Sequence, residues 1–366
     1  MPSETPAYPL RAIYFNLTNR CNLQCRHCWL APPLATVKHK GSSRPAFTEG
    51  LGLEAAAAAV DQAMPLGLTS VKLTGGEPFL RTDIFAFIDL FHRRGLAIDI
   101  ETNATLIDKT AAERLSGYPI RSISTSIDST DAKWHDGFRG AKGAWAKTTE
   151  GIGHLVAQGL RPQIIMALGR ANKDQIEAVT RLAVRLGAGS LKINPITPIS
   201  GGAKMHQQEE TLAVDDLLTL ARWVAGGLQP HSAIPVIFSL PIVFAPLKQL
   251  IADASPWCAI HNILGIVENG DISFCGIQCV EKKLVMGNIN THAIAELWRD
   301  NALLNRMREL VPKCLEGICA RCFFKKRCLG YCRACAYHQD EKLTGPYWLC
   351  QQAFDMGLFP EARCLY

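Results

Sequence analysis

The first two hundred residues alternate short runs rich in aliphatic and β-branched residues with longer stretches of helical periodicity. Six short runs predict strands, at 12–17, 70–73, 97–101, 122–126, 163–167 and 190–194. Five longer stretches predict helices, at 53–64, 83–94, 109–115, 144–158 and 173–186. Regular alternation of this kind predicts an α/β fold, with a parallel sheet and helices outside it. Because six units are fewer than the eight of a closed barrel, we expect a partial (β/α)6 TIM-like barrel that is open on one side.

Residues 201–257 follow a different pattern and end in an apolar run at 233–247. Pro235, Pro241 and Pro246 interrupt this run, and it is shorter than the roughly 20 residues of a membrane-spanning helix. We therefore expect a buried segment and no membrane partner.

From residue 258 the apolar periodicity weakens, and 11 of the 14 cysteines lie in 258–366. The pattern predicts a barrel at 1–200, a connector at 201–257 and a small cysteine-rich C-terminal domain at 258–366. With few periodic apolar positions, we expect metal rather than an apolar core to hold this last domain together.

Composition and charge exclude several classes of protein. Hydrophobic residues make up 48% of the 366 and charged residues 20%, which is typical of a folded globular protein. The formal net charge of +6 suits an anionic cofactor or an acidic peptide but is too small to indicate nucleic acid. The first residues show no secretory signal, so we expect a cytoplasmic protein whose reduced cysteines serve metal or redox chemistry.

Three cysteines follow the first predicted strand with the spacing C-x3-C-x2-C, namely Cys21, Cys25 and Cys28. Ligand and active-site residues lie at the carboxyl ends of strands in an α/β barrel. A structural zinc site needs four ligands, and His27 could be the fourth. Because His27 is adjacent to Cys28, however, we expect its side chain to point elsewhere. A [4Fe–4S] cluster held by three cysteines leaves one iron open to a small molecule.

A glycine-rich turn follows the second predicted strand. Gly75 and Gly76 allow the backbone to approach a ligand closely, and Pro78 sets the turn. Glu77 can accept hydrogen bonds from an ammonium group. On its own this would be an ordinary turn, but next to the cysteine motif it indicates a ligand site.

Seven cysteines of the C-terminal region form a spaced series, Cys258, Cys275, Cys319, Cys322, Cys328, Cys332 and Cys350. Pairs with two intervening residues are common in zinc sites, so a pair of zinc knuckles is an alternative. Zinc would leave the N-terminal motif unexplained.

These motifs together resemble those of the radical SAM superfamily with a C-terminal SPASM domain. The resemblance implies a partial barrel with a [4Fe–4S] cluster on Cys21, Cys25 and Cys28, whose open iron is chelated by S-adenosylmethionine. It also implies that the turn at 75–78 holds the amino group of that cofactor.

Three weaker matches follow later strands. Asn103 and Ser126 end the third and fourth predicted strands, where this family often contacts the cofactor. Arg139 resembles an arginine that helps to bind the cofactor carboxylate, and a guanidinium suits a carboxylate. A helix cap, a turn or a surface ion pair would also explain these three residues.

The SPASM resemblance implies two auxiliary [4Fe–4S] clusters, which gives three clusters in all. The outer cluster would be held by Cys319, Cys322, Cys328 and Cys350. The inner cluster would be held by Cys258, Cys275 and Cys332. Its fourth ligand stays open between Cys279, Cys335, the substrate and none, and no role is assigned to Cys314 and Cys364.

The resemblance also implies an oxidoreductase that works through a 5′-deoxyadenosyl radical. Our first hypothesis is oxidative modification, by crosslinking, of a ribosomally synthesised peptide with a leader. Because only twenty residues precede Cys21, we expect any leader-recognition protein to be separate, and a flavodoxin- or ferredoxin-like reductant to supply electrons. One alternative is a radical enzyme that oxidises a porphyrin or other cofactor precursor. A second is a non-catalytic zinc or iron–sulfur interaction protein.

Overall fold

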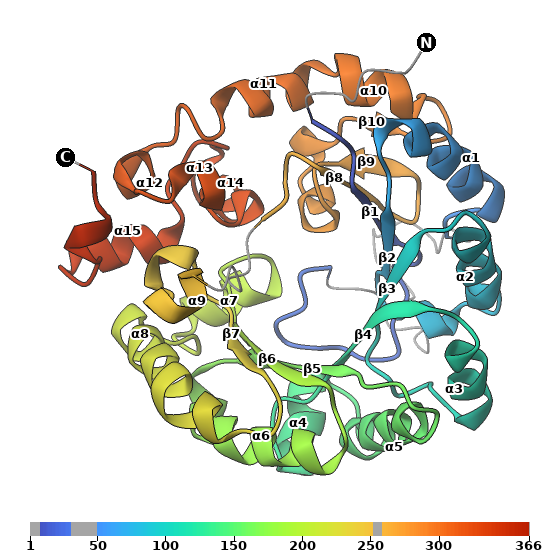
Figure 1. Ribbon diagram of the computed structural model, residues 1–366, viewed down its shortest axis with the longest axis horizontal. Helices are drawn as coiled ribbons and strands as arrows, with labels where there is room; N and C mark the ends of the chain where they lie inside the picture. The colour runs from blue at the N-terminus through green and yellow to red at the C-terminus, as the bar shows by residue number, and fades with distance from the viewer. Residues whose placement is uncertain (1–7, 31–49, 252–257, 366) are drawn as a thin grey trace, which may run out of the picture.

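The computed structural model of the chain describes residues 8–30, 50–251 and 258–365. One sheet carries its strands in the order β10-β9-β8-β1-β2-β3-β4-β5-β6-β7. The six predicted strands are present as Ala12–Asn16 (β1), Ser70–Thr74 (β2), Ala97–Glu101 (β3), Ile120–Ser126 (β4), Gln163–Leu168 (β5) and Ser190–Pro195 (β6). Neighbours from β1 to β6 pair in parallel, which confirms the predicted α/β fold and partial barrel (Figure 1).

The helices cover the outside of this curved sheet (Figure 1). The predicted ones are present as Leu53–Ala63 (α1), Ile84–Arg93 (α2), Lys109–Ser116 (α3), Ala144–Ala157 (α5) and Ile176–Arg185 (α6). The last begins later than predicted because Arg170–Gln175 forms a 3-10 helix. Three more follow as Ala132–Arg139 (α4), Gly201–Gln207 (α7) and Val214–Trp223 (α8).

Helix α4 was not predicted, because it is short and contains Gly137. Its start is fixed by Asp131, whose carboxylate accepts hydrogen bonds from the backbone N–H groups of Lys133 and Trp134 at 2.9 and 3.1 Å. This is a standard helix N-cap.

The proline-interrupted apolar run adds a seventh parallel strand, Val236–Phe238 (β7), beside β6. Ile234, Ile242 and Val243 in the same run are buried. The prediction of a buried segment thus holds for its middle part, whereas its ends are exposed, Leu247 to 67%.

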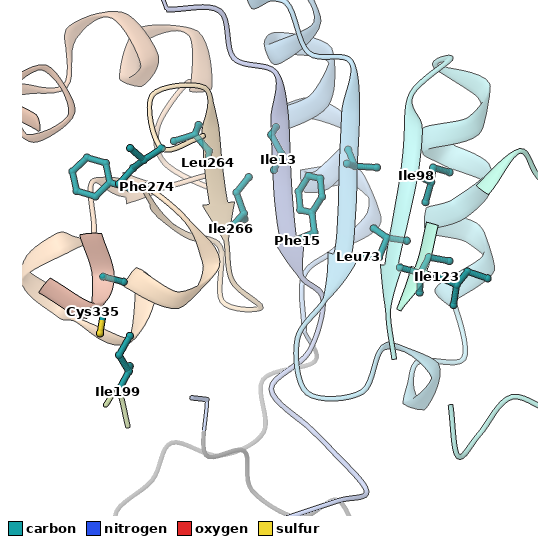
Figure 2. Packing of buried hydrophobic residues seen from close by; sticks show 14 of the residues in the cluster. Ile13, Phe15, Leu73, Ile98, Ile123, Ile199, Leu264, Ile266, Phe274 and Cys335 are labelled. Atoms are coloured by element: carbon teal, nitrogen blue, oxygen red, sulfur yellow. The ribbon is translucent and has the colours of Figure 1, made fainter. Parts of the chain in front are cut away.

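The C-terminal region continues both the sheet and the core. Ile263–Ile266 (β8) pairs in parallel with β1, and Asp271–Ser273 (β9) and Gly287–Asn288 (β10) extend the edge antiparallel. Its helices are Ile294–Asp300 (α10), Ala302–Leu310 (α11), Gly317–Arg321 (α12), Lys325–Cys328 (α13), Arg333–Asp340 (α14) and Trp348–Asp355 (α15), and they follow Leu247–Ile251 (α9). Leu264, Ile266 and Phe274 pack in one cluster with barrel residues such as Phe15 (Figure 2). Contrary to expectation, this region shares a continuous apolar core with the barrel.

Strand alternation decides which side chains reach the interior of the barrel. On β1, Ile13 and Phe15 are buried toward the helices, and Phe15 stacks on Phe91 with ring centroids 5.2 Å apart. The alternate residues of this strand, Tyr14 and Asn16, line a cavity on the inner face. Polar side chains of β1, β2, β3 and β6 therefore line the lumen, whereas β5 contributes the apolar Ile165 and Ala167.

Candidate active site

The loop that carries the three N-terminal cysteines is held between two neighbouring loops. On one side, the N–H groups of Gly76 and Glu77 donate to the carbonyl oxygens of Thr18 and Arg20 at 2.7 and 2.8 Å. On the other side, residues 24 and 26 donate backbone hydrogen bonds to the carbonyls of residues 139 and 138, at 2.8 and 3.0 Å. The loop is thus fixed to the glycine-rich turn and to the end of α4.

Gly75 and Gly76 are needed for this contact. A Cβ at Gly76 would lie 2.0 Å from the carbonyl oxygen of Arg20, and Gly75 has a φ of 133°, which disfavours any other residue. The sequence predicted that these glycines let backbone approach a ligand, but the group they approach is the backbone of the cysteine loop. Pro78 begins a short 3-10 helix, Pro78–Leu80, as expected of a turn-setting proline.

Glu77 is fully buried behind the cysteine loop. Its carboxylate accepts hydrogen bonds from the N–H of Asn103 at 2.7 Å, the N–H of Phe79 at 3.0 Å and the hydroxyl of Thr102 at 2.7 Å. Burial raises its pKa to about 6, although these hydrogen bonds act in the opposite direction. A cationic ligand placed against Glu77 would stabilise its charged form.

Arg139 forms a buried ion pair with Asp128. Its Nε and Nη2 donate to the two Asp128 oxygens at 2.6 and 2.8 Å. Burial would lower the pKa of Arg139 and raise that of Asp128, but their mutual attraction reverses both effects, so both stay charged. The Nη1 of Arg139 donates to the Sγ of Cys25, 3.6 Å away. The sequence suggested Arg139 for the cofactor carboxylate and did not identify Asp128 as its partner.

The predicted residues of the N-terminal site lie together. The side-chain amide nitrogen of Asn103 is 3.9 Å from the Sγ of Cys21. Burial raises the pKa of Cys21 to about 12, so a thiolate there needs a neighbouring positive centre. Ser126 and Arg139 line a cavity of about 360 Å³ at the ends of the strands. Three cysteines on one loop, with N–H groups directed at the sulfurs of Cys21 and Cys25, suit an iron–sulfur cluster.

Four of the C-terminal cysteines line one enclosed pocket, namely Cys319, Cys322, Cys328 and Cys350. Three others, Cys258, Cys275 and Cys332, line a second cavity of about 340 Å³ on the inner face of the barrel. These are the two groups that the sequence predicted. Tyr331 lines both spaces, so the two groups are neighbours.

The remaining cysteines differ in their surroundings. Cys335 is fully buried in the apolar core and does not line the inner cavity, whereas Cys314 is exposed. The backbone of Cys364 pairs with that of Cys322 in an isolated antiparallel β-bridge. The side chain of Cys279 lies outside the described part of the structure.

No disulfide links the cysteines of the described segments. Among the side chains that the structure describes, no three His, Cys, Asp or Glu converge as ligands of one metal ion do. The seven cysteines of the two C-terminal groups instead line cavities.

Sequence reasoning missed a group of charged residues inside the barrel. Lys72 on β2 and Glu101 on β3 form an ion pair at 2.9 Å, and both line the inner cavity with Lys192 from β6. Tyr14 lies beside them, and burial raises its pKa. The sequence feature that could have revealed this group is a lysine or glutamate at inward positions of otherwise apolar strands.

Comparison with known protein families identifies the two halves of this site. Residues 15–183 match the model of the radical SAM superfamily, and residues 258–336 match the SPASM iron–sulfur cluster-binding domain. The chain belongs to the radical SAM superfamily and carries a SPASM domain. The expected cofactors of this radical SAM enzyme, [4Fe–4S] clusters and S-adenosylmethionine, are thereby confirmed.

Curated relatives cover nearly the whole of this radical SAM enzyme. It is 28% identical over 350 residues to the AdoMet-dependent heme synthase of Methanosarcina barkeri. This match covers 92% of this chain and 94% of the relative. It is 25% identical to the mycofactocin maturase MftC of Mycobacterium ulcerans, over 95% and 90% of the two chains. The crystal structure of Streptococcus suis SuiB bound to its precursor peptide SuiA superposes with a TM-score of 0.73 at 18% identity, covering 94% of this chain and 76% of SuiB, which supports the fold. In the described segments, no helix has the length and hydropathy required to span a membrane.

Proposed function

We propose that this radical SAM enzyme oxidises a porphyrin that carries carboxylate side chains and binds in the barrel lumen. The single observation that carries the proposal is the unpaired cation of Lys192. This side chain borders both the 360 Å³ and the 340 Å³ cavities. It therefore faces the space in which a substrate would meet the cofactor.

Two lysines of the lumen, Lys72 and Lys192, share one carboxylate. Lys72 pairs directly with Glu101 at 2.9 Å, whereas Lys192 makes no direct hydrogen bond or ion pair with any residue in the described ranges. Burial, followed by repulsion from Lys72, lowers the pKa of Lys192, and the attraction of Glu101 offsets this only in part. A substrate carboxylate would supply the missing negative charge, and such a pair is strong when water is excluded.

The walls around Lys192 suit a flat, apolar ring. Trp29, Tyr331 and Trp348 line the larger cavity, and aromatic faces bind planar conjugated molecules well. The heme synthase relative, which matches over more than nine-tenths of both chains, favours a tetrapyrrole among the carboxylate-bearing planar substrates.

The residues of the chain then have distinct roles. Cys21, Cys25 and Cys28 would hold the cluster that, with S-adenosylmethionine, supplies a 5′-deoxyadenosyl radical. Glu77 would accept a hydrogen bond from the cofactor ammonium, and Lys192 would orient the substrate carboxylate. The apolar walls exclude water and stray hydrogen donors from the reacting carbon.

Peptide crosslinking remains the second candidate, and the mycofactocin maturase relative favours it. A peptide with an acidic side chain or a free carboxyl terminus would also satisfy Lys192. The substrates themselves separate the two candidates.

The test uses the anaerobically reconstituted enzyme with S-adenosylmethionine and a reductant. An iron porphyrin with propionate side chains is compared with the peptide encoded nearest to the gene, and 5′-deoxyadenosine and substrate mass are followed. We expect turnover with the porphyrin. We expect Lys192→Met to lower kcat/KM about 10- to 100-fold, since a charge-assisted hydrogen bond contributes about 1.5–3 kcal/mol.

Two controls make the result specific. Lys192→Arg keeps the charge and should retain most activity, and Lys109→Met removes an exposed lysine of α3 and should change nothing. Turnover with the peptide alone would support the second candidate. Unchanged kinetics in Lys192→Met would remove the role of the lumen cation.

A further inference from the structure

A patch of exposed apolar and basic side chains covers the outer group of cysteines. Its apolar members are Phe323, Phe354 and Leu365, which are 63%, 37% and 45% exposed. Its basic members are Arg321 and Lys326, which are exposed, and Arg363, which is half-buried. Exposed phenylalanine and leucine side chains gathered in one place are typical of interaction surfaces. We call these six residues the outer patch.

Backbone pairing brings the outer patch together from distant parts of the sequence. The N–H of Phe323 donates to the carbonyl of Arg363 at 2.9 Å, and the N–H of Leu365 donates to the carbonyl of Arg321 at 2.6 Å. The Arg321 guanidinium also lies 5.1 Å from the centre of the Phe354 ring. These contacts join Arg321, Phe323, Phe354, Arg363 and Leu365, and Lys326 follows on α13; α12, α13, α15 and the C-terminal segment lie at one end of the molecule (Figure 1).

The same pairing places the patch directly over the cysteine pocket. Cys322 and Cys364 are paired in an antiparallel bridge, and side chains alternate across extended backbone. Cys322 is buried and lines the pocket of the outer cysteines, whereas its neighbours Arg321 and Phe323 are exposed. A protein docked here would be separated from the cysteine pocket by one layer of side chains.

The outer patch has a positive charge that the chain itself does not neutralise. Arg321, Lys326 and Arg363 form no ion pair with any acidic residue that the structure describes. Arg363 donates instead to the carbonyls of Val243 and Ala245. Lys325 of α13 adds to the positive field, and the nearest acidic residues in sequence are Asp355 and Glu361.

We propose that the outer patch is the docking surface for an acidic one-electron carrier protein, of the flavodoxin or ferredoxin kind. Apolar contacts at its centre and cations around them match the usual anatomy of a transient interface with an anionic partner. The inference rests on the assignment of the outer cluster to Cys319, Cys322, Cys328 and Cys350. It does not depend on whether the substrate is a porphyrin or a peptide.

The test measures binding of an oxidised flavodoxin of net negative charge to the reconstituted holoenzyme, without substrate. We expect Arg321→Glu/Lys326→Glu to weaken binding tenfold or more at about 50 mM salt, and less at about 500 mM, because salt screens exposed charges. We expect Phe323→Ser to weaken binding about fivefold at both salt concentrations. Hydrogen exchange at 321–326 and 361–365 should slow when flavodoxin is added.

A matched control uses exposed residues of α6. Val184 is 38% exposed and Arg185 is an exposed cation, and neither belongs to the patch. Val184→Ser and Arg185→Glu should leave binding within twofold. Equal losses in the patch and control variants would overturn the proposal, and so would a patch variant that changes only the oligomeric state, since the surface would then bind a second copy. Because binding is measured without substrate, failure of the porphyrin hypothesis leaves this result unaffected.

Discussion

Replacing Asp128 with asparagine tests whether the buried ion pair with Arg139 stabilises the barrel and the cysteine loop. Asp128 has no exposed surface and accepts two hydrogen bonds from Arg139, at 2.6 and 2.8 Å, and one from the N–H of Ala167, at 3.0 Å. Asparagine keeps the shape but leaves the guanidinium buried without a counter-charge. Breaking a buried pair in this way costs about 3–5 kcal/mol, which is a large part of the roughly 5–15 kcal/mol that stabilises a typical protein.

The assay is urea unfolding of the apoprotein, followed by tryptophan fluorescence, with iron content after reconstitution as a second readout. Asp99→Asn is the control, because Asp99 pairs with Arg121, whose side chain is 52% exposed, and such a pair contributes about 1 kcal/mol or less. Asp128→Leu/Arg139→Leu should be more stable than Asp128→Asn, since no charge is left unpaired. If Asp128→Asn were no more destabilising than Asp99→Asn, the buried pair would not stabilise this region.

The same pair predicts a pH dependence. Burial would raise the pKa of Asp128, but Arg139 holds it well below the roughly 3.9 of an unfolded chain. A lowered folded pKa means that the stabilisation is fully present above about pH 4 and is lost as the pH falls toward the folded value. The stability gap between wild type and Asp128→Asn should therefore close in acid, and a gap that stayed constant would contradict the charge assignment.

Three further predictions follow from the site. Burial raises the pKa of Glu77 to about 6, above the roughly 4.3 of an unfolded chain, so the folded state is destabilised as Glu77 loses its proton. Between about pH 4 and pH 7, the free energy of unfolding of the wild type, measured with urea, should therefore fall by about 2 kcal/mol more than that of Glu77→Gln. Gly76→Ala places a methyl group 2.0 Å from the Arg20 carbonyl and should lower iron content at the N-terminal site, whereas Gly153→Ala on α5 meets open space and should be neutral or slightly stabilising. Cys25→Ala should abolish 5′-deoxyadenosine formation, whereas Cys322→Ala should retain it and lose product; full product from Cys322→Ala would show that the outer cluster is not needed.

The sequence alone predicted the six barrel strands because they depend on local patterns, whereas the division of the C-terminal cysteines into two groups came from the family resemblance. The sequence alone could not predict the charged lumen. A strand such as Ser190–Pro195, in which Leu191 and Ile193 alternate with Lys192, has the same pattern as a strand with one face in water. Only the curvature of the sheet turns that polar face toward an enclosed space.

The partner of Arg139 was unpredictable for a related reason. Asp128 precedes it by eleven residues, and the two meet only because α4 folds back over the end of β4. The family resemblance suggested that Arg139 helps to bind the cofactor carboxylate, but it gave no sign that one N–H of Nε and one of Nη2 are engaged by Asp128. The Nη1 of Arg139 is the nitrogen directed at the cysteine loop.

Backbone strain points to Tyr331 as the residue that joins the three parts of the site. Leu329, Gly330 and Tyr331 have φ values of 54°, 73° and 59°, and a left-handed conformation costs about 1–2 kcal/mol for each residue other than glycine. Such a run persists only where the surrounding structure requires it. The tyrosine it positions lines the outer cysteine pocket, the inner cysteine cavity and the larger lumen cavity, and its hydroxyl lies 3.1 Å from that of Ser239 after β7. The strained turn thus holds one aromatic side chain at the junction of both auxiliary sites and the substrate space, so the SPASM domain forms a wall of the active site as well as a site for clusters.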